Sequence, residues 1–111
     1  MKKRIILLTG APGVGKTETA RALIEKSPPN SAWIDTDKIA AIHPFRIDEN
    51  FYRLLYKNLT TCIRNYDEWG AELIIISGVI LPSNILSKLL ETSLGYNWRI
   101  YGLVTDKVVL S

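Results

Sequence analysis

The chain has 111 residues, of which 47% are hydrophobic and 23% charged, so we expect one globular domain over residues 1–111 with no room for a second. Its formal net charge of +3 suits anionic ligands such as nucleotides. The sequence has no clustered basic stripe, so we expect no nucleic-acid partner. The single cysteine, Cys62, excludes an intramolecular disulfide, and no apolar run is long enough for a membrane span or a signal-peptide core. These features predict a cytoplasmic protein without a membrane association.

Apolar patterning predicts strands and helices in strict alternation. Short apolar runs without alternation are typical of strands buried in a parallel sheet, and apolar residues that recur at spacings of three and four are typical of helices. In chain order, the predicted elements are strand 4–9, helix 16–26, strand 32–35, helix 49–69, strand 73–77, helix 83–94 and strand 98–104. This order predicts an α/β fold, a three-layer sandwich around a parallel sheet with right-handed crossovers. The stretch 39–48, which is broken near His43 and Pro44, fits no clear element, and 105–111 resembles a loop that leads into a helix.

Each predicted helix has one apolar face that we expect to pack on the sheet. These faces comprise Ala20, Leu23 and Ile24 in the first helix, Phe51, Leu54, Leu55, Leu59, Cys62, Ile63 and Tyr66 in the second, and Leu86, Leu89 and Leu90 in the third. Glycines are expected to end the second helix at Gly70 and the third at Gly95. The three tryptophans, Trp33, Trp69 and Trp98, are expected in the core or at its rim.

A glycine-rich loop follows the first strand and opens the first helix. It fits G-x-x-x-x-G-K-[ST] at every fixed position and reads Gly10-Ala11-Pro12-Gly13-Val14-Gly15-Lys16-Thr17. Its glycines leave bare backbone N–H groups for phosphate, and the helix dipole adds to them. Lys16 supplies a point charge for the β- and γ-phosphates, and Thr17 supplies a hydroxyl for Mg²⁺. We therefore expect ATP and Mg²⁺ as cofactors, bound by these eight residues and Glu18. A turn without a ligand is disfavoured, since a turn needs neither Lys16 nor three glycines.

This loop, together with a strand that ends in Asp35-Thr36-Asp37, resembles the P-loop small-molecule kinases. These include shikimate, gluconate and chloramphenicol phosphotransferase-like enzymes and related nucleoside and nucleotide kinases. The resemblance covers almost the whole chain, and its specific part is the loop. It implies a sheet order of 2-3-1-4 with the loop on the central strand. It also implies a kinase that transfers the γ-phosphate of ATP to a small hydroxylated acceptor, which would be bound in the variable stretch Ile39–Leu59.

Two carboxylates follow the second predicted strand. The carboxyl ends of parallel strands bind ligands, so Asp35 and Asp37 are expected beside the loop. In the kinases that the chain resembles, an aspartate here orients and deprotonates the acceptor hydroxyl, often with a second that helps hold Mg²⁺ through water. Carried over, the catalytic set is Lys16, Asp37 as the base and Asp35 as its helper, and the metal set is Thr17 and Asp35. The reverse assignment of the two aspartates stays open, as does a helix-capping role.

Two features depart from related proteins. Many P-loop ATPases place an acidic residue where this chain has Ser77, which disfavours a AAA-like ATPase fragment. The resembled kinases also continue into an arginine-bearing lid helix, a fifth strand and an adenine-contacting loop, whereas no arginine follows Arg99 here. We therefore expect a shortened product or fragment, or a clamp supplied by another chain. A catalytically incomplete nucleotide-binding module is the alternative to a kinase. The fourth strand is expected to leave an exposed sheet edge that is open to pairing.

Overall fold

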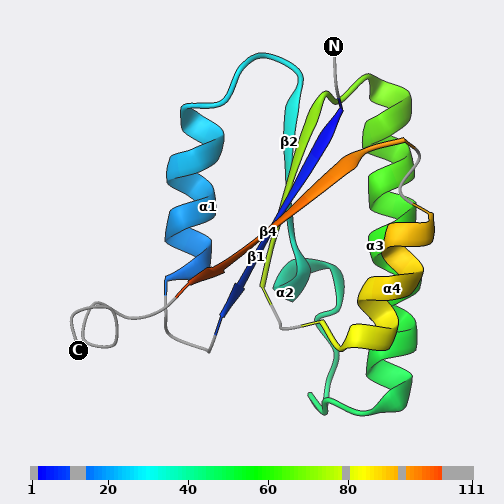
Figure 1. Ribbon diagram of the computed structural model, residues 1–111. Helices are drawn as coiled ribbons and strands as arrows, with labels where there is room; N and C mark the ends of the chain where they lie inside the picture. Colours follow the sequence, from blue (N-terminus) through cyan, green and yellow to red (C-terminus); the bar gives the residue numbers. More distant parts are fainter. Residues whose placement is uncertain (1–2, 11–14, 79–80, 93–94, 104–111) are drawn as a thin grey trace.

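The fold is an alternation of strands and helices (Figure 1). The computed structural model describes residues 3–10, 15–78, 81–92 and 95–103. Its elements are β1 (Arg4–Gly10), α1 (Lys16–Glu25), β2 (Ser31–Asp35), α2 (Thr36–Ile39), α3 (Glu49–Trp69), β3 (Leu73–Ser77), α4 (Ser83–Glu91) and β4 (Asn97–Leu103). The predicted strands and helices are confirmed to within a few residues, and α2 is an addition. The expected loop and helix start over 105–111 lie outside the described residues.

The four strands form one parallel sheet in the order β2-β3-β1-β4, as the family resemblance implied. The register pairs Ile5 of β1 with Ile74 of β3 on one side and with Trp98 of β4 on the other. Asp35 at the end of β2 lies opposite Ser77 at the end of β3. All four strands therefore point their carboxyl ends to the same edge of the sheet, where the candidate site lies.

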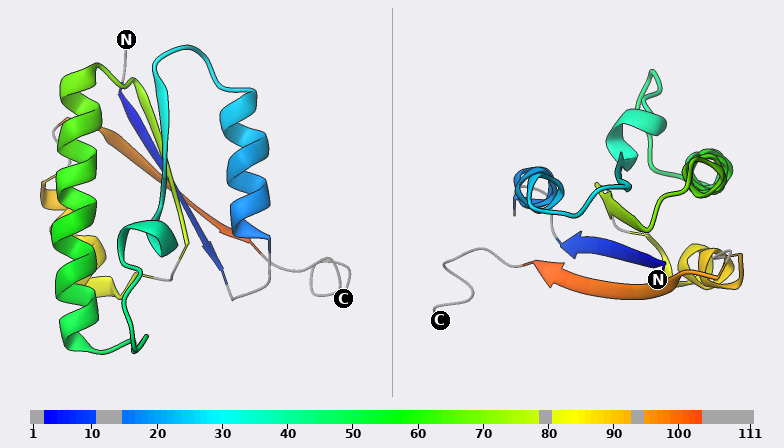
Figure 2. Two further views of the ribbon diagram at one scale, coloured as in Figure 1. Left: turned by 180° about the vertical axis from the view of Figure 1, so that it is seen from behind. Right: turned by 90° about the horizontal axis from the view of Figure 1, so that it is seen from above.

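Helices cover both faces of the sheet and complete the predicted three-layer sandwich. In Figures 1 and 2, α1 lies on one face, and α3 and α4 lie side by side on the other. The α1 face has a small buried cluster of Leu8, Ala20, Leu73 and Ile75. The opposite face holds the larger cluster, which includes Ile5, Leu7, Ile34, Phe51, Leu55, Leu59, Ile74, Ile76 and Leu89. Burial of these apolar side chains is the main favourable contribution to folding.

The long helix α3 begins and ends at residues whose chemistry suits those positions. Asp48 caps its first turn, because its side chain accepts a hydrogen bond of 2.9 Å from the backbone N–H of Phe51. Gly70 ends it in a left-handed conformation with φ of 103°, which glycine adopts without strain. The expected apolar face is confirmed: Phe51, Leu55, Leu59 and Ile63 are buried, and Leu54, Cys62 and Tyr66 are half-buried.

Two predictions about buried side chains are wrong, those for Leu90 and Trp69. Leu90 was expected inside but is 42% exposed, because α4 packs through Ile85 and Leu89, four residues apart, and Leu90 lies about 100° further round the helix. Helix α4 also ends at Glu91, before the predicted Leu94. Trp69 was expected to pack in or beside the core, but it is 60% exposed in the last turn of α3.

The outer strand β4 is exposed along most of its length, as predicted. Ile100 and Tyr101 are about half exposed, and within the described residues β4 pairs only with β1. A strand edge with unpaired backbone groups and apolar side chains can accept a further strand.

A polar cluster ties the amino end of β1 to α3 and to the approach to β4. The Lys3 Nζ atom donates a hydrogen bond of 2.7 Å to the Asp67 carboxylate, and this bond lowers the pKa of Asp67. Tyr96 donates its hydroxyl proton to the Ala71 carbonyl oxygen at 2.6 Å. Burial, and then the neighbouring Asp67 carboxylate, raise the pKa of Tyr96 to about 12. The Tyr96 hydroxyl therefore stays protonated in the folded state well above the pH at which a free tyrosine ionises.

We expect this tyrosine to make stability depend on alkaline pH. Its contribution is complete below the unfolded pKa of about 10 and is lost as the pH rises through 12, since only the unfolded chain releases the proton in between. Tyr96→Phe should lose about 1 kcal/mol of unfolding free energy at pH 7 and should show a shallower decline between pH 10 and 12. Urea denaturation at several pH values measures both effects. Tyr101→Phe, at a half-exposed tyrosine, is the matched control, and identical pH slopes for wild type and Tyr96→Phe would contradict the assignment.

Candidate nucleotide-binding site

The candidate site lies at the carboxyl edge of the sheet, where β1, β2 and β3 end (Figure 1). Gly10 ends β1, and Gly15 precedes the first residue of α1. Four residues of the predicted loop, Ala11, Pro12, Gly13 and Val14, lie outside the described residues. The structure therefore places the two ends of the loop, one on the central strand and the other at a helix N-terminus.

Lys16 joins the two ends of the loop. Its Nζ atom donates a hydrogen bond of 2.6 Å to the carbonyl oxygen of Gly10. Gly15 has φ of 92°, in the left-handed region, and supplies no side chain to cap α1. The N–H groups of the first turn therefore have no capping side chain at Gly15. A cation, backbone N–H groups and the Thr17 hydroxyl meet at one helix N-terminus, a combination that suits an anion. Glu18 lies in the same turn and is exposed.

The two aspartates after β2 have different surroundings. Asp35 is 9% exposed, and its Oδ1 atom accepts a hydrogen bond of 3.0 Å from the backbone N–H of Asp37, which caps α2. Asp37 is exposed in the first turn of α2, and its carboxylate has no hydrogen bond or ion pair with other described residues. The capping role that the sequence left open is thus observed for Asp35. Asp37 has the carboxylate that is available to a ligand.

The end of β3 packs tightly against the start of α2. Gly78 has φ of 122°, and a Cβ atom there would collide with Thr36 Oγ1 and lie 3.0 Å from the Thr36 nitrogen. Thr36 itself is only 1% exposed. This contact fixes the segment that holds Asp35 and Asp37. The sequence analysis missed it, although a glycine directly after a buried strand was a signal for a close approach.

Ser77 occupies the strand end where many P-loop ATPases have an acid. It is 1% exposed, and its Oγ atom accepts a hydrogen bond of 2.9 Å from Trp33 Nε1. The end of β3 therefore carries a neutral hydroxyl group, which is hydrogen-bonded to the Trp33 indole. Among the described residues there is no group of three or more metal-ligating His, Cys, Asp or Glu side chains.

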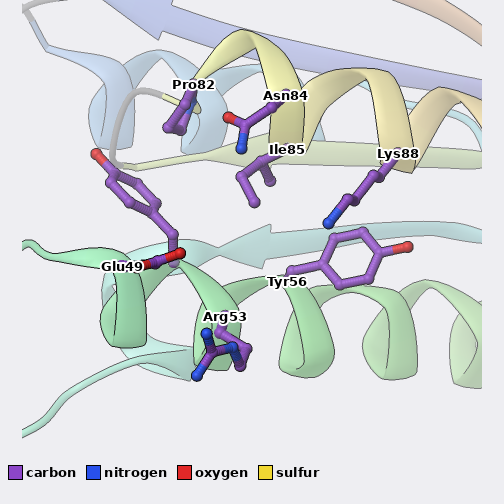
Figure 3. Close-up of a pocket in the computed structure, with 8 residues that line it drawn as sticks. Glu49, Arg53, Tyr56, Pro82, Asn84, Ile85 and Lys88 are labelled. Carbon is purple, nitrogen blue, oxygen red and sulfur yellow. The ribbon is translucent and has the colours of Figure 1, made fainter.

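A hollow of about 200 Å³ lies between the amino-terminal halves of α3 and α4 (Figure 3). Its lining includes Glu49, Arg53, Tyr56, Asn84, Ile85 and Lys88. In Figure 3 the Lys88 side chain extends toward the Tyr56 ring, and its Nζ atom is 5.8 Å from the ring centroid. The α3 residues of this lining belong to the stretch Ile39–Leu59, where the resemblance implied an acceptor pocket. The hollow thus combines cations, a carboxylate and aromatic rings.

The fold and the loop ends define a class of protein. A parallel sheet in the order 2-3-1-4, with a lysine at the start of the helix that follows the central strand, is the fold of the P-loop kinases. The family model "Zeta toxin" matches residues 1–61, and the chain belongs to this family. No curated protein matches the sequence. In the part of the chain that the structure describes, we find no helix that could cross a membrane.

Several solved structures share the fold at low sequence identity. A chain of the Pnkp1/Rnl/Hen1 complex matches with a TM-score of 0.72 at 17% identity, over 98% of this chain and 38% of that one. A sugar kinase from Janibacter sp. HTCC2649 gives a TM-score of 0.73 at 15% identity, over 97% of this chain and 64% of that one. Shikimate kinase from Bacteroides thetaiotaomicron gives 0.64 at 21% identity, over 96% and 60%. The chain therefore spans less than two thirds of the length of each of these structures.

Proposed function

We propose that this chain binds ATP and Mg²⁺ and transfers the γ-phosphate to a small hydroxylated acceptor. The observation that carries the proposal is the position of Lys16. Its ammonium group bridges to Gly10 at the mouth of a loop that opens onto an uncapped helix N-terminus. Neither a structural turn nor a surface lysine requires this arrangement. Membership of the zeta toxin family and the kinase fold support the same function.

In the proposed reaction, the acceptor hydroxyl oxygen attacks the γ-phosphorus atom. A new oxygen–phosphorus bond forms, the bond from the γ-phosphorus to the β–γ bridging oxygen breaks, and ADP leaves. The Lys16 ammonium group would stabilise the negative charge on the β- and γ-phosphates during the transfer. Asp37 would accept the proton of the acceptor hydroxyl. The open carboxylate of Asp37 fits that role, whereas Asp35 is engaged as a helix cap.

The residues present also fit a magnesium ion. Thr17 is half-buried in the first turn of α1, and its hydroxyl makes no hydrogen bond with other described residues. Asp35 uses Oδ1 as a cap, which leaves Oδ2 for a metal-bound water. Oxygen ligands of this kind suit Mg²⁺, which would neutralise charge on the phosphates.

For the acceptor we propose the hollow between α3 and α4. Arg53 and Lys88 would attract an anionic group, and Tyr56, Asn84 and Glu49 offer hydrogen bonds to hydroxyls. A volume of about 200 Å³ limits the bound part to a single ring or a short chain. We therefore expect sugars and nucleosides, with or without an acidic group, to be the first acceptors to assay.

We expect Asp37→Asn to lower phosphoryl transfer by about 10²- to 10⁴-fold and to leave ATP binding unchanged, because only the proton acceptor is lost. The measurement is ATP turnover with Mg²⁺ and a panel of sugars, nucleosides and antibiotics. Glu68→Gln, at an exposed carboxylate on α3, is the matched control. If Asp37→Asn transfers phosphate at the wild-type rate, Asp37 is not the base, and Asp35→Asn then tests the reverse assignment.

A nucleotide-binding module without catalysis is the second candidate. Among the described residues, Lys16 bonds at the loop and no arginine does, which favours this candidate, since phosphoryl transfer needs cations that clamp the transferring group. It predicts saturable ATP or ADP binding that is lost in Lys16→Ala, with no turnover. Transfer by the isolated chain would exclude it. A AAA-like fragment is disfavoured by the neutral Ser77, and an ordered hexamer by light scattering with ATP would be needed to support it.

A further inference from the structure

Two neighbouring hollows border the free edge of β2. Among the described residues β2 pairs only with β3, so alternate residues of Ser31–Asp35 direct their N–H and C=O groups away from the sheet. A hollow of about 460 Å³ is lined by Ser31, Ala32 and Trp33, and another of about 170 Å³ is lined by Trp33, Ile34 and Asp35. Both hollows include Trp33 and Tyr66 in their walls. We call this pair of hollows the β2-edge groove, and it follows all five residues of the strand.

Three aromatic residues are among those that line the β2-edge groove. Trp33 comes from the strand, and Tyr66 and Trp69 come from the last turns of α3. Trp69 is 60% exposed, which is unusual for a tryptophan that has no ligand to cover it. An extended chain laid along β2 would cover its ring and gain the associated burial energy.

Two cations lie beside the Trp33 ring, Lys38 in the lining of the β2-edge groove and Arg21 outside that lining on α1. The Arg21 guanidinium carbon lies 5.9 Å from the Trp33 ring, and Lys38 Nζ lies 6.0 Å from it. Neither cation forms an ion pair with another described residue. The one carboxylate in the lining, Asp35, is engaged with the N–H of Asp37. That bond leaves the charge of Asp35 in place, so two cations stand against one carboxylate, and the net charge beside Trp33 is positive.

We propose that the β2-edge groove binds an extended, acidic peptide segment of a partner protein by adding it as a fifth strand beside β2. Backbone hydrogen bonds to the free edge would supply affinity, and the two hollows on either side of Trp33 would accept alternate side chains. Acidic side chains would pair with Arg21 and Lys38. The proposal does not rest on the kinase activity: the groove shares Asp35 with the proposed metal set, but no residue of the glycine-rich loop lines it.

The probe is a capped seven-residue peptide of alternating glutamate and valine, with an alternating lysine and valine peptide as its charge-reversed counterpart. With the full chain, we expect saturable binding of the acidic peptide by calorimetry. We also expect at least tenfold slower amide exchange at alternate residues of 31–35. Trp69→Ala and Lys38→Glu should each weaken binding about tenfold. Leu90→Ala, which removes an exposed leucine from α4, should leave it unchanged.

Several outcomes would overturn the proposal. Equal binding of the lysine peptide would refute the charge argument, and binding without protection of the β2 amides would refute strand addition. If the chain forms a stable dimer through β2 and the peptide does not displace it, the occupant of the groove is a second copy of the chain. Failure of the acidic peptide to bind at millimolar concentration would also refute it. Circular dichroism establishes whether each variant is folded. If Trp69→Ala does not fold, Lys38→Glu, at an exposed position, provides the test.

Discussion

Lys16→Ala is expected to abolish measurable ATP binding, with a loss of affinity of about a hundredfold or more. The substitution removes the ammonium group that bonds to the carbonyl oxygen of Gly10, at the start of the glycine-rich loop. Removal of a single preorganised donor from a charged site commonly costs two to three powers of ten, roughly 3–4 kcal/mol. Calorimetric titration with ATP and with ADP, in the presence of Mg²⁺, measures the effect.

The control for this experiment is Lys26→Ala, at an exposed lysine that caps the other end of the same helix. It makes the same change in net charge, so a loss that is specific to Lys16 separates the local contact from the general field of the protein. Equal affinity for wild type and Lys16→Ala would remove the basis of the proposed function. Because Lys16 is half-buried and bonds only to a backbone carbonyl, its removal should change the stability of the fold by less than about 1.5 kcal/mol.

Gly78→Ala is expected to destabilise the fold by about 2–4 kcal/mol. A residue other than glycine is strained at φ of 122°, and the added methyl group meets the Thr36 side chain and backbone. Since Thr36 lies between Asp35 and Asp37, relief of the clash would displace both carboxylates. Phosphoryl transfer should therefore fall at temperatures where the variant is still folded. Urea denaturation gives the change in stability.

Gly102→Ala is a matched substitution on β4. No atom lies within 4 Å of the added methyl group, so we expect a change within about 0.5 kcal/mol. The double variant Gly78→Ala with Thr36→Ala should recover part of the lost stability, because it removes the Thr36 oxygen from the collision. A Gly78→Ala protein as stable as wild type would show that the two strand ends are not in such close contact.

The sequence was sufficient to predict the elements whose signals are local. Helix α3 was predicted with its observed bounds, because the apolar face repeats from Phe51 to Tyr66 and Gly70 carries the chemistry of a helix end; the Asp48 cap was not predicted. Strand β3 was predicted because five consecutive residues lie buried between two helical layers and leave an unbroken apolar run. The strand order came from the family resemblance, since no local pattern specifies which strands pair.

Other features depend on tertiary contacts and were not predictable. Helix α2 has only four residues, too few for a periodic pattern, and its start is marked only by the Asp35 cap. The buried face of α4 comprises Ile85 and Leu89. The sequence indicated a face about one residue further round, because Leu86, Leu89 and Leu90 are all apolar. In the site, the motif identified Lys16, but the bond between Trp33 and Ser77 joins residues 44 positions apart. Such a contact becomes visible only when β2 and β3 are aligned.

The strand order also has a consequence for how the chain is made. β1 leaves the ribosome well before either of its partners, because Ile5 pairs with Ile74 and with Trp98. At typical rates of synthesis, roughly 5–20 residues per second, the apolar β1 waits about 5–20 seconds for its second partner. Contacts so distant in sequence also slow folding after release, because long loops must close before any of them forms. The strand that ends at the glycine-rich loop is therefore synthesised before the strands on both sides of it and is among the last to be enclosed, so a chaperone has a long opportunity to bind there.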